Sequence, residues 1–286
     1  MLYSYLGGDT MKRKEALEAR NNVVVKSNDL IQRSRFSLTT QQQRMMLYLI
    51  SKIMPQDENF KTYQLDIVEF CQTCGIDYSG GKTYEELKAS IKALADKSMW
   101  IEIEDEKGEA ETLIRWIEEP TIRKNSGIVE VQLNKYLKPY LLQLKKNFTS
   151  YELIYTLRFR SKYSIRLYEL ACSVVFHPLQ EYRKRYTVEE LKKRLGAENY
   201  TDYRKFRVKA LDVAVREINE YSDKNISYNQ ISSKGRKIEA IEIVITSKNS
   251  IEAAKIRSDT EHELGLDDGQ ITIFDTLVER GLISNQ

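Results

Sequence analysis

The stretches that decide the predicted fold are residues 187–196, TVEELKKRLG, and residues 202–216, DYRKFRVKALDVAVR. Thr187, followed three residues later by Glu190, is a signature of a helix start, and Gly196 is typical of a helix end. Asp202 begins a second, longer helix whose apolar residues recur at helical spacing: Tyr203, Phe206, Ala210, Val213 and Ala214. A short helix, a tight turn and a long helix predict a helix-turn-helix.

The flanking segments complete this unit. A helix is predicted over residues 164–175, because Leu167, Leu170, Ala171 and Val174 fall on one face. After the long helix, residues 226–231 and 238–245 are predicted as two strands joined by a turn at residues 232–235, SSKG. Three helices followed by a β-hairpin are typical of the winged form of the helix-turn-helix.

The first half of the chain shows the same order. Helices are predicted over 40–54, capped by Thr40 with Gln43, over 66–75, capped by Asp66 with Glu69, and over 83–95, capped by Thr83 with Glu86. Strands follow at 101–104, 113–117 and 128–133. Tyr84 matches Tyr203 at an offset of 119 residues, and Lys107-Gly108 matches Lys234-Gly235 at an offset of 127. These offsets favour a tandem duplication over chance matches between short amphipathic patterns.

The predicted fold class is therefore α+β, with two tandem winged-helix domains. The predicted division is an N-terminal extension (1–20), a first winged-helix domain (21–145), a second (146–248) and an acidic C-terminal tail (249–286). A chain of 286 residues, 41% hydrophobic, is long enough for two modest cores. Three cysteines cannot form a disulfide framework and no long apolar run is present, so we expect a cytoplasmic protein that does not enter the membrane.

Charge is unevenly distributed behind a net charge of only +3. Residues 160–216 contain 14 Lys and Arg against 7 Asp and Glu, a local excess of +7. Residues 251–286 contain 3 basic and 8 acidic residues, a local net charge of −5. A clustered basic region indicates nucleic-acid binding, although charge runs are more often only solvated surface.

The long basic helix of the second unit is the predicted DNA-recognition element. Its cations lie on the side opposite the apolar stripe, where Arg and Lys can donate to guanine or hold phosphates, and the wing adds three more. The predicted DNA-binding residues are Arg204, Lys205, Arg207, Lys209, Arg216, Lys234, Arg236 and Lys237. The alternative is a solvated amphipathic helix. The first unit offers Lys82, Thr83, Lys88 and Lys92, diluted by Glu85, Glu86, Glu102 and Glu104, so we expect weaker DNA binding or a dimer surface there.

Three enzyme motifs are incomplete in this sequence. Residues 75–83 resemble a phosphate-binding loop, but Ile76 stands where the pattern requires glycine six residues before Lys82. Cys71 and Cys74 have zinc spacing, but no second pair completes a tetrahedral site. Two histidines, His177 and His262, are too few for the paired-histidine metal site of a rolling-circle nickase. We therefore predict no catalytic site, no metal and no cofactor.

Several segments resemble the theta-type plasmid replication initiators, the Rep proteins with two winged helices. The resemblance runs from about Asn21 to Ile245, and no single piece of it is decisive. It rests on the order and spacing of NVVVKSNDLI (22–31), FSLT (36–39), QRMMLYLI (43–50), SIRLYEL (164–170), the segment from Phe206 to Leu211, EIN (217–219) and KGRK (234–237). The acidic tail lies outside it.

The resemblance implies a non-enzymatic initiator that binds direct repeats (iterons) in double-stranded plasmid origin DNA, most strongly through its C-terminal winged helix. It also implies opening of an AT-rich region, recruitment of host initiator, helicase and polymerase components, a monomer–homodimer equilibrium through the first winged helix, and repression of the protein's own promoter. The recognition role then falls on residues 203–216 and the wing role on residues 234–237.

Two other classes of function remain open. A transcription regulator with two winged-helix domains would share every feature above, and a metal-dependent nicking enzyme is a distant third.

Two further expectations concern partners. Apolar Trp100, Ile101, Ile103 and Trp116 either form a protein-binding surface or fill the first core. Residues 270–274, QITIF, resemble a peptide that docks on the polymerase sliding clamp, the alternative being one amphipathic turn packed back on a winged helix.

Overall fold

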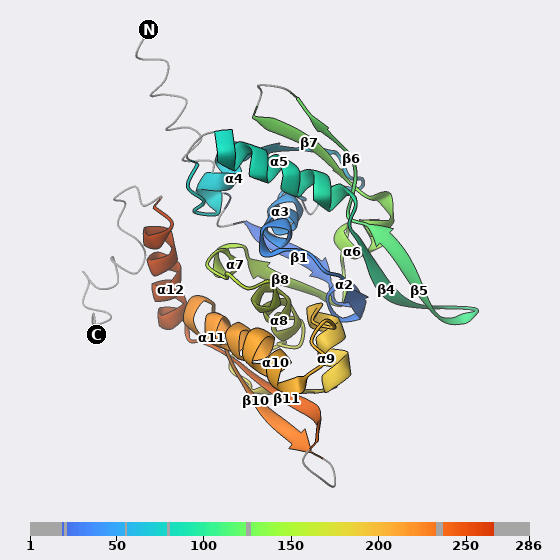
Figure 1. The fold of residues 1–286 in the computed structure, drawn as a ribbon, viewed down its shortest axis with the longest axis vertical. Helices are drawn as coiled ribbons and strands as arrows, with labels where there is room; N and C mark the ends of the chain where they lie inside the picture. Colours follow the sequence, from blue (N-terminus) through green and yellow to red (C-terminus); the bar gives the residue numbers. More distant parts are fainter. Residues whose placement is uncertain are drawn as a thin grey trace.

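The computed structural model describes residue 19 and residues 22–54, 56–78, 81–123, 127–232 and 237–265. Two units with the same element order make up most of it (Figure 1). The first unit contains α3 (Thr40–Ser51), β3 (Thr62–Asp66), α4 (Ile67–Thr73), α5 (Gly81–Ala95), β6 (Ile117–Ile122) and β7 (Ile128–Leu133). The second contains α8 (Lys162–Cys172), β9 (Tyr182–Thr187), α9 (Val188–Leu195), α10 (Tyr203–Phe206), α11 (Asp212–Tyr221), β10 (Lys224–Ser232) and β11 (Ile238–Ser247).

Both units have the same sheet topology. The last strand lies between the other two, giving the order β3-β7-β6 in the first unit and β9-β11-β10 in the second. In each, the first strand leads directly into the second helix through a capping residue, Asp66 or Thr187, whose side chain accepts backbone N–H bonds from that helix. Two winged helices in tandem are therefore confirmed. Strands β3 and β9 were not predicted, because short strands with alternating polar residues carry little apolar signal.

The prediction that the hairpin of residues 101–104 and 113–117 is the wing of the first unit is wrong. Strands β4 (Ser98–Asp105) and β5 (Gly108–Arg115) do form a hairpin, but it pairs with β2 (Ser34–Arg35) in a separate sheet. The wing of the first unit is β6–β7, so Lys107-Gly108 is not the counterpart of Lys234-Gly235. The strands of any hairpin have side chains that alternate with a period of two. This pattern alone does not indicate which other strand the hairpin pairs with. In Figure 1 the two hairpins of the first unit project in different directions.

Several predicted helix ends shift in the structure. The capping box of α3 is formed by Thr39 and Gln42, one residue before the predicted pair, and the helix ends at Ser51 rather than Met54. Helix α5 begins at Gly81, so Thr83 lies inside it and donates to the Asp77 carbonyl instead of capping. The end of α9 agrees with the prediction. Gly196 has φ +64, and a Cβ there would collide with the Phe36 carbonyl oxygen, so only glycine fits.

A strand pair joins the predicted first and second domains. Strand β1 (Val23–Ser27) precedes the first unit and β8 (Phe148–Glu152) follows it, and they pair antiparallel from Val23↔Glu152 to Ser27↔Phe148. Short elements surround this pair: α2 (Asn28–Arg33), a 3-10 turn (Lys135–Leu137), α6 (Lys138–Leu141) and α7 (Ile154–Leu157). Apolar residues from both units form one continuous buried cluster around it.

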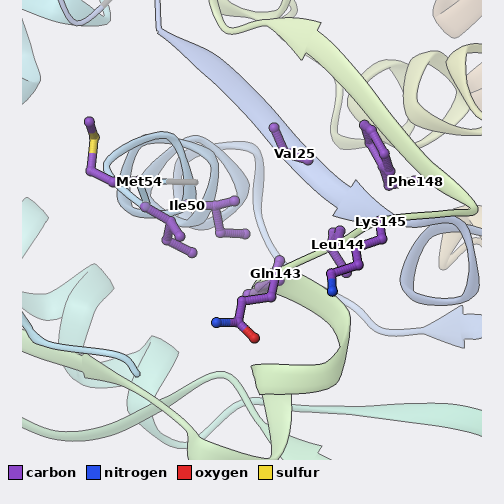
Figure 2. A pocket seen from close by; sticks show the side chains of 9 residues that line it. Val25, Ile50, Met54, Gln143, Leu144, Lys145 and Phe148 are labelled. Atoms are coloured by element: carbon purple, nitrogen blue, oxygen red, sulfur yellow. The ribbon is translucent and has the colours of Figure 1, made fainter. Parts of the chain in front are cut away.

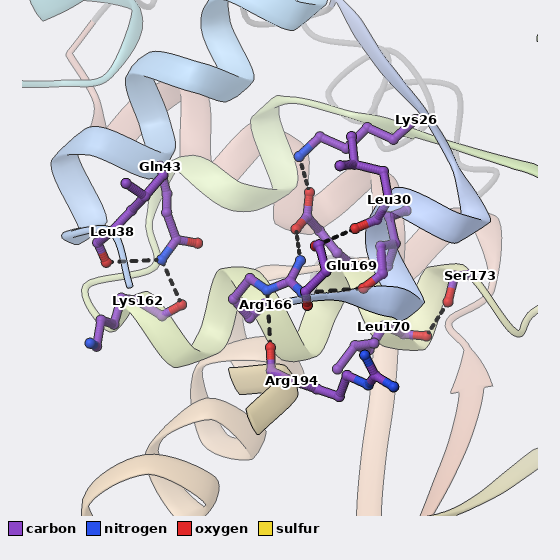
Figure 3. Close-up of polar contacts among 12 residues, drawn as sticks. Lys26, Leu30, Leu38, Gln43, Lys162, Arg166, Glu169, Leu170, Ser173 and Arg194 are labelled. Atoms are coloured by element: carbon purple, nitrogen blue, oxygen red, sulfur yellow. Dashed lines mark hydrogen bonds and ion pairs between the residues drawn. The ribbon is translucent and has the colours of Figure 1, made fainter. Parts of the chain in front are cut away.

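Three buried charges lie between the units (Figure 3). Glu169 on α8 accepts a bond from Lys26 Nζ at 2.5 Å and from Arg166 at 3.0 Å, and the Tyr151 hydroxyl donates to it at 2.7 Å. Arg166 also donates to the carbonyls of Ile31, Ser34 and Arg194. Burial alone would raise the pKa of Glu169, but the two cations outweigh it and hold the pKa below its ordinary value. Arg166 thus ties α8 to α2, β2 and α9.

Part of the predicted acidic tail is helical. Helix α12 (Ser250–Glu263) starts at a capping box made by Asn249 and Glu252 and packs on α7 and α11. Arg257 pairs with Glu152 and Glu263 pairs with Arg158, both at 2.6 Å. The predicted clamp-binding segment, residues 270–274, lies outside the described residues. No helix of the described residues is long and apolar enough to cross a membrane.

Candidate nucleic-acid interface

The predicted recognition helix consists of α10, a π-turn (Arg207–Leu211) and α11. Asp202 caps its start by accepting the Lys205 N–H, and the Asp212 N–H reaches back five residues to the Arg207 carbonyl. A π-turn contains one more residue per turn than an α-turn, so the side chains that follow it are rotated about the helix axis. The core face therefore passes through Phe206, Ala210, Leu211, Ala214 and Ile218, all fully buried, whereas Val213, predicted to be inward, is only half-buried.

Four predicted cations lie exposed along the outer side of this helix: Arg204, Lys205, Lys209 and Arg216. Among the described residues, none of the four has a carboxylate partner within ion-pair distance. Arg207 differs, because it is half-buried, its Nε lies 3.8 Å from Asp212, and that nitrogen is buried without a hydrogen-bond partner. Lys237 is exposed just before β11, while Lys234 and Arg236 lie outside the described residues.

Side-chain bonds hold the helix against strand β10 of the wing. The Tyr228 hydroxyl donates to Asp212 at 2.6 Å, and the Tyr203 hydroxyl donates to Gln230 at 2.9 Å. Asn219 both accepts from and donates to the backbone of Ile226. Burial, and then the bond to Asp212, raise the pKa of Tyr228 above its ordinary value, so this hydroxyl keeps its proton. These bonds thus join the helix to strand β10 of the wing.

The helix also connects to the start of the second unit through Glu217. This buried carboxylate accepts the backbone N–H groups of Arg160 and Ser161 at 3.1 Å and the Ser164 hydroxyl at 2.6 Å. It therefore satisfies donors at the N-terminus of α8, where a negative charge is favourable. The position of Glu217 is set by α8 as well as by α11.

Strand β9 adds cations that the sequence analysis did not assign to the site. Lys184 and Arg185 are exposed on this strand, which pairs with β11 of the wing, while Arg183 is engaged by Glu181 and Glu242. Lys193 is exposed on α9, the helix before the turn. The run YRKRYT at 182–187 was the available signal.

The corresponding helix of the first unit, α5, has three lysines and two glutamates. Lys82 lies 3.9 Å from Glu86 and Lys88 lies 3.4 Å from Glu85, and Lys92 is exposed on the last turn. The nearby β4–β5 hairpin is acidic, with Glu102 paired to Glu111 and Glu104 paired to Glu109 across the strands. This side of the first unit lacks the excess of cations on α10–α11.

The two tryptophans have different environments. Trp116 is 1% exposed and packs edge-on against Phe36, so it fills the core, as one of the two readings expected. Trp100 is 42% exposed on β4, opposite Leu113, which is 53% exposed, with the Arg35 guanidinium 5.8 Å from its ring centre. Ile101 is buried and Ile103 half-buried. Trp100 is therefore not part of the core, and its role in a protein-binding surface stays a prediction.

The cysteine pair and an apolar hollow lie away from the cationic helix. Cys71 and Cys74 are buried near α4, and burial raises the pKa of Cys71 to about 12, so its thiol stays protonated. No group of three or more metal-ligating residues is found in the described part of the chain. An apolar hollow of about 520 Å³ lies between the end of α3, β1 and the loop before β8, with Ile50, Leu144 and Phe148 among its walls (Figure 2).

Comparisons with known proteins place this architecture in a family. The family model described as "Initiator Replication protein, WH1" matches residues 23–172, from β1 to the end of α8, and "Initiator Rep protein, WH2" matches residues 187–245. A "Replication initiation protein" of Escherichia coli is 26% identical over 207 residues, which are 70% of this chain and 63% of that protein. The chain thus spans less than two thirds of that relative.

Among solved structures, the Pi initiator protein in complex with iteron DNA has a similar fold. The TM-score is 0.66 at 20% sequence identity, and the match covers 81% of this chain and 99% of that chain. At this level of identity the likeness concerns the fold alone. Because the WH1 model by itself spans more than half of the sequence, the chain belongs to the family of replication initiator (Rep) proteins built from two winged-helix domains.

Proposed function

We propose that this protein initiates plasmid replication by binding repeated sequences in double-stranded origin DNA through its second winged helix. The observation that carries the proposal is the set of four exposed cations on α10–α11 that have no carboxylate partner among the described residues. Their helix is held on the wing by the Tyr228–Asp212 and Tyr203–Gln230 bonds. An N-terminal half of a recognition helix that carries Arg and Lys suits base-edge and phosphate contacts in the major groove. The Pi initiator, similar in fold, is described bound to iteron DNA.

The two units have different roles in this proposal. The second supplies most of the specific affinity, and Lys184 and Arg185 on strand β9 and Lys237 just before β11 make contacts with the DNA backbone. Lys234 and Arg236 are proposed for the same role. The first unit, in which two of the three lysines of α5 pair with glutamates, governs association between copies through the exposed Trp100 and Leu113. The proposal further includes recruitment of host initiator and helicase, sliding-clamp binding by residues 270–274, repression of the protein's own promoter, a cytoplasmic location and no catalytic activity.

Matched lysine substitutions test which unit recognises DNA. Lys209→Ala on α10–α11 and Lys92→Ala on α5 remove the same side chain from corresponding helices. Binding is measured to duplexes selected from a random pool and to DNA upstream of the protein's own gene. If Lys209 reads a base, its loss should cost about 1–3 kcal/mol at the selected sequence and little elsewhere. Lys92→Ala should cost less; equal losses from both variants contradict the assignment to the second unit.

Origin-dependent replication separates an initiator from a transcription regulator. A plasmid that carries the bound repeats and no other origin should replicate only in cells that supply the protein. Lys209→Ala should reduce this replication in proportion to its loss of DNA binding. If the protein represses its promoter but never supports replication, the regulator is the correct function. Cleavage of the origin strand in Mg²⁺ or Mn²⁺ would instead favour the nicking enzyme.

A further inference from the structure

One apolar side chain stands among the cations of the recognition helix. Val208 is 42% exposed. It is the only large apolar residue that is exposed on residues 203–221, all of which the structure describes. Arg204 and Lys205 precede it by four and three residues, so these exposed side chains lie on the same side of the helix. Lys209, which follows Val208 directly, is also exposed. Val208 is therefore placed where the predicted base contacts are made.

The core does not account for a valine at this position. The inner side of the helix is filled by Phe206, Ala210 and Leu211, none of which is exposed. An exposed β-branched residue is a poor local choice, because it has a lower helix propensity than Lys, Glu or Ala and leaves apolar surface in water. Val208 also lies inside the π-turn, a distortion that is frequent at functional sites. Unfavourable local choices of this kind concentrate at functional surfaces.

The chemistry of the major groove identifies what an exposed valine among cations would meet. Base edges there present hydrogen-bond donors and acceptors, and the one apolar group is the C5-methyl of thymine. We propose that Val208 packs against the C5-methyl of a thymine in the bound repeat, while the neighbouring Arg and Lys side chains contact base edges or phosphates. This inference rests on the proposed function of the second unit. It makes Val208 a specificity determinant that distinguishes T·A from C·G at one position of the repeat.

Deoxyuridine substitution tests the contact, because it removes only the methyl group from thymine. The probes are duplexes selected from a random pool by the full-length protein, with each thymine in turn replaced by deoxyuridine. At one thymine the wild-type protein should bind about fourfold more weakly, the factor that corresponds to roughly 0.8 kcal/mol for one buried methyl or methylene group. Val208→Ala should bind the thymine duplex more weakly than the wild-type protein does. It should bind the thymine and deoxyuridine duplexes equally well.

A matched variant controls for the general effect of trimming a valine. Val23→Ala makes the same change at a residue that is 46% exposed on β1, outside the recognition helix. It should discriminate thymine from deoxyuridine as the wild-type protein does. The wild-type protein should lose affinity at one thymine when deoxyuridine replaces it, and Val208→Ala should show no such loss there. If no thymine behaves in this way, the inference is overturned.

The proposed function can fail separately. If the protein selects no sequence, or if Arg204→Ala, Lys205→Ala and Lys209→Ala together leave selection unchanged, the second unit does not recognise the sequence, and the contact proposed for Val208 fails with it. If Lys209→Ala removes selection while every deoxyuridine duplex behaves like its parent, only the inference about Val208 is wrong.

Discussion

Removing the charge of Glu169 should strongly destabilise the protein. Glu169→Gln keeps the shape of the side chain but leaves Lys26 and Arg166 buried, at 5% and 3% side-chain exposure, without a counter-charge. Breaking a buried ion pair by removing one partner costs about 3–5 kcal/mol. That is a large part of the roughly 5–15 kcal/mol by which domains are stable. Lys26→Met in the same chain should restore part of the loss, since it removes one unpaired cation.

Chemical denaturation followed by circular dichroism measures this effect. Glu111→Gln is the control, because Glu111 pairs with Arg35 at 2.6 Å in a partly exposed position, and such surface pairs contribute about 0–1 kcal/mol. The difference between wild type and Glu169→Gln should also depend on pH. The folded pKa of Glu169 lies below the unfolded value of about 4.3, so its contribution is present above that pH and is lost as the pH falls through the folded pKa. A loss no larger than that of Glu111→Gln would refute the reasoning.

Three further predictions concern other parts of the molecule. Gly196→Ala should lower the unfolding midpoint in urea, because its left-handed conformation and the adjacent Phe36 carbonyl both exclude a Cβ; an unchanged midpoint would contradict this. Lys184→Ala should weaken binding to all duplexes alike and reduce the slope of log affinity against log salt by about one, whereas sequence-dependent loss would indicate a base contact. Cys71 should stay unmodified by a thiol reagent at neutral pH until the protein unfolds, because its thiol is buried and its pKa is about 12; rapid labelling of the native protein would argue against this.

Features encoded in local sequence were predictable. The capping of α4 by Asp66 and of α9 by Thr187, the left-handed end at Gly196 and the order of helices all follow from side chains within a few residues. The cationic side of α10–α11 was also predictable, since helical spacing alone places Lys205 and Lys209 together.

Features that depend on distant residues were not predictable. The pairing of β4 with β2, the salt bridge between Lys26 and Glu169 and the packing of α12 on α11 join segments far apart in the chain. The π-turn packs against α8, and nothing in the sequence between Arg207 and Leu211 distinguishes it from an α-helix. The wing of the first unit was misassigned for the same reason, because two hairpins there, β4–β5 and β6–β7, have the same alternating pattern.

The pairing of β1 with β8 has a consequence for how the nascent chain folds. Strand β1 leaves the ribosome first, but its partner ends at Glu152, and 125 residues separate Ser27 from Glu152. At synthesis rates of about 5–20 residues per second, β1 waits roughly 6–25 seconds as an open edge, and Lys26 waits still longer for Glu169. The sheet formed by β1 and β8 therefore cannot be completed before the start of the C-terminal unit has been made. A fragment ending at residue 145 would keep that unpaired edge permanently, and we expect it to aggregate.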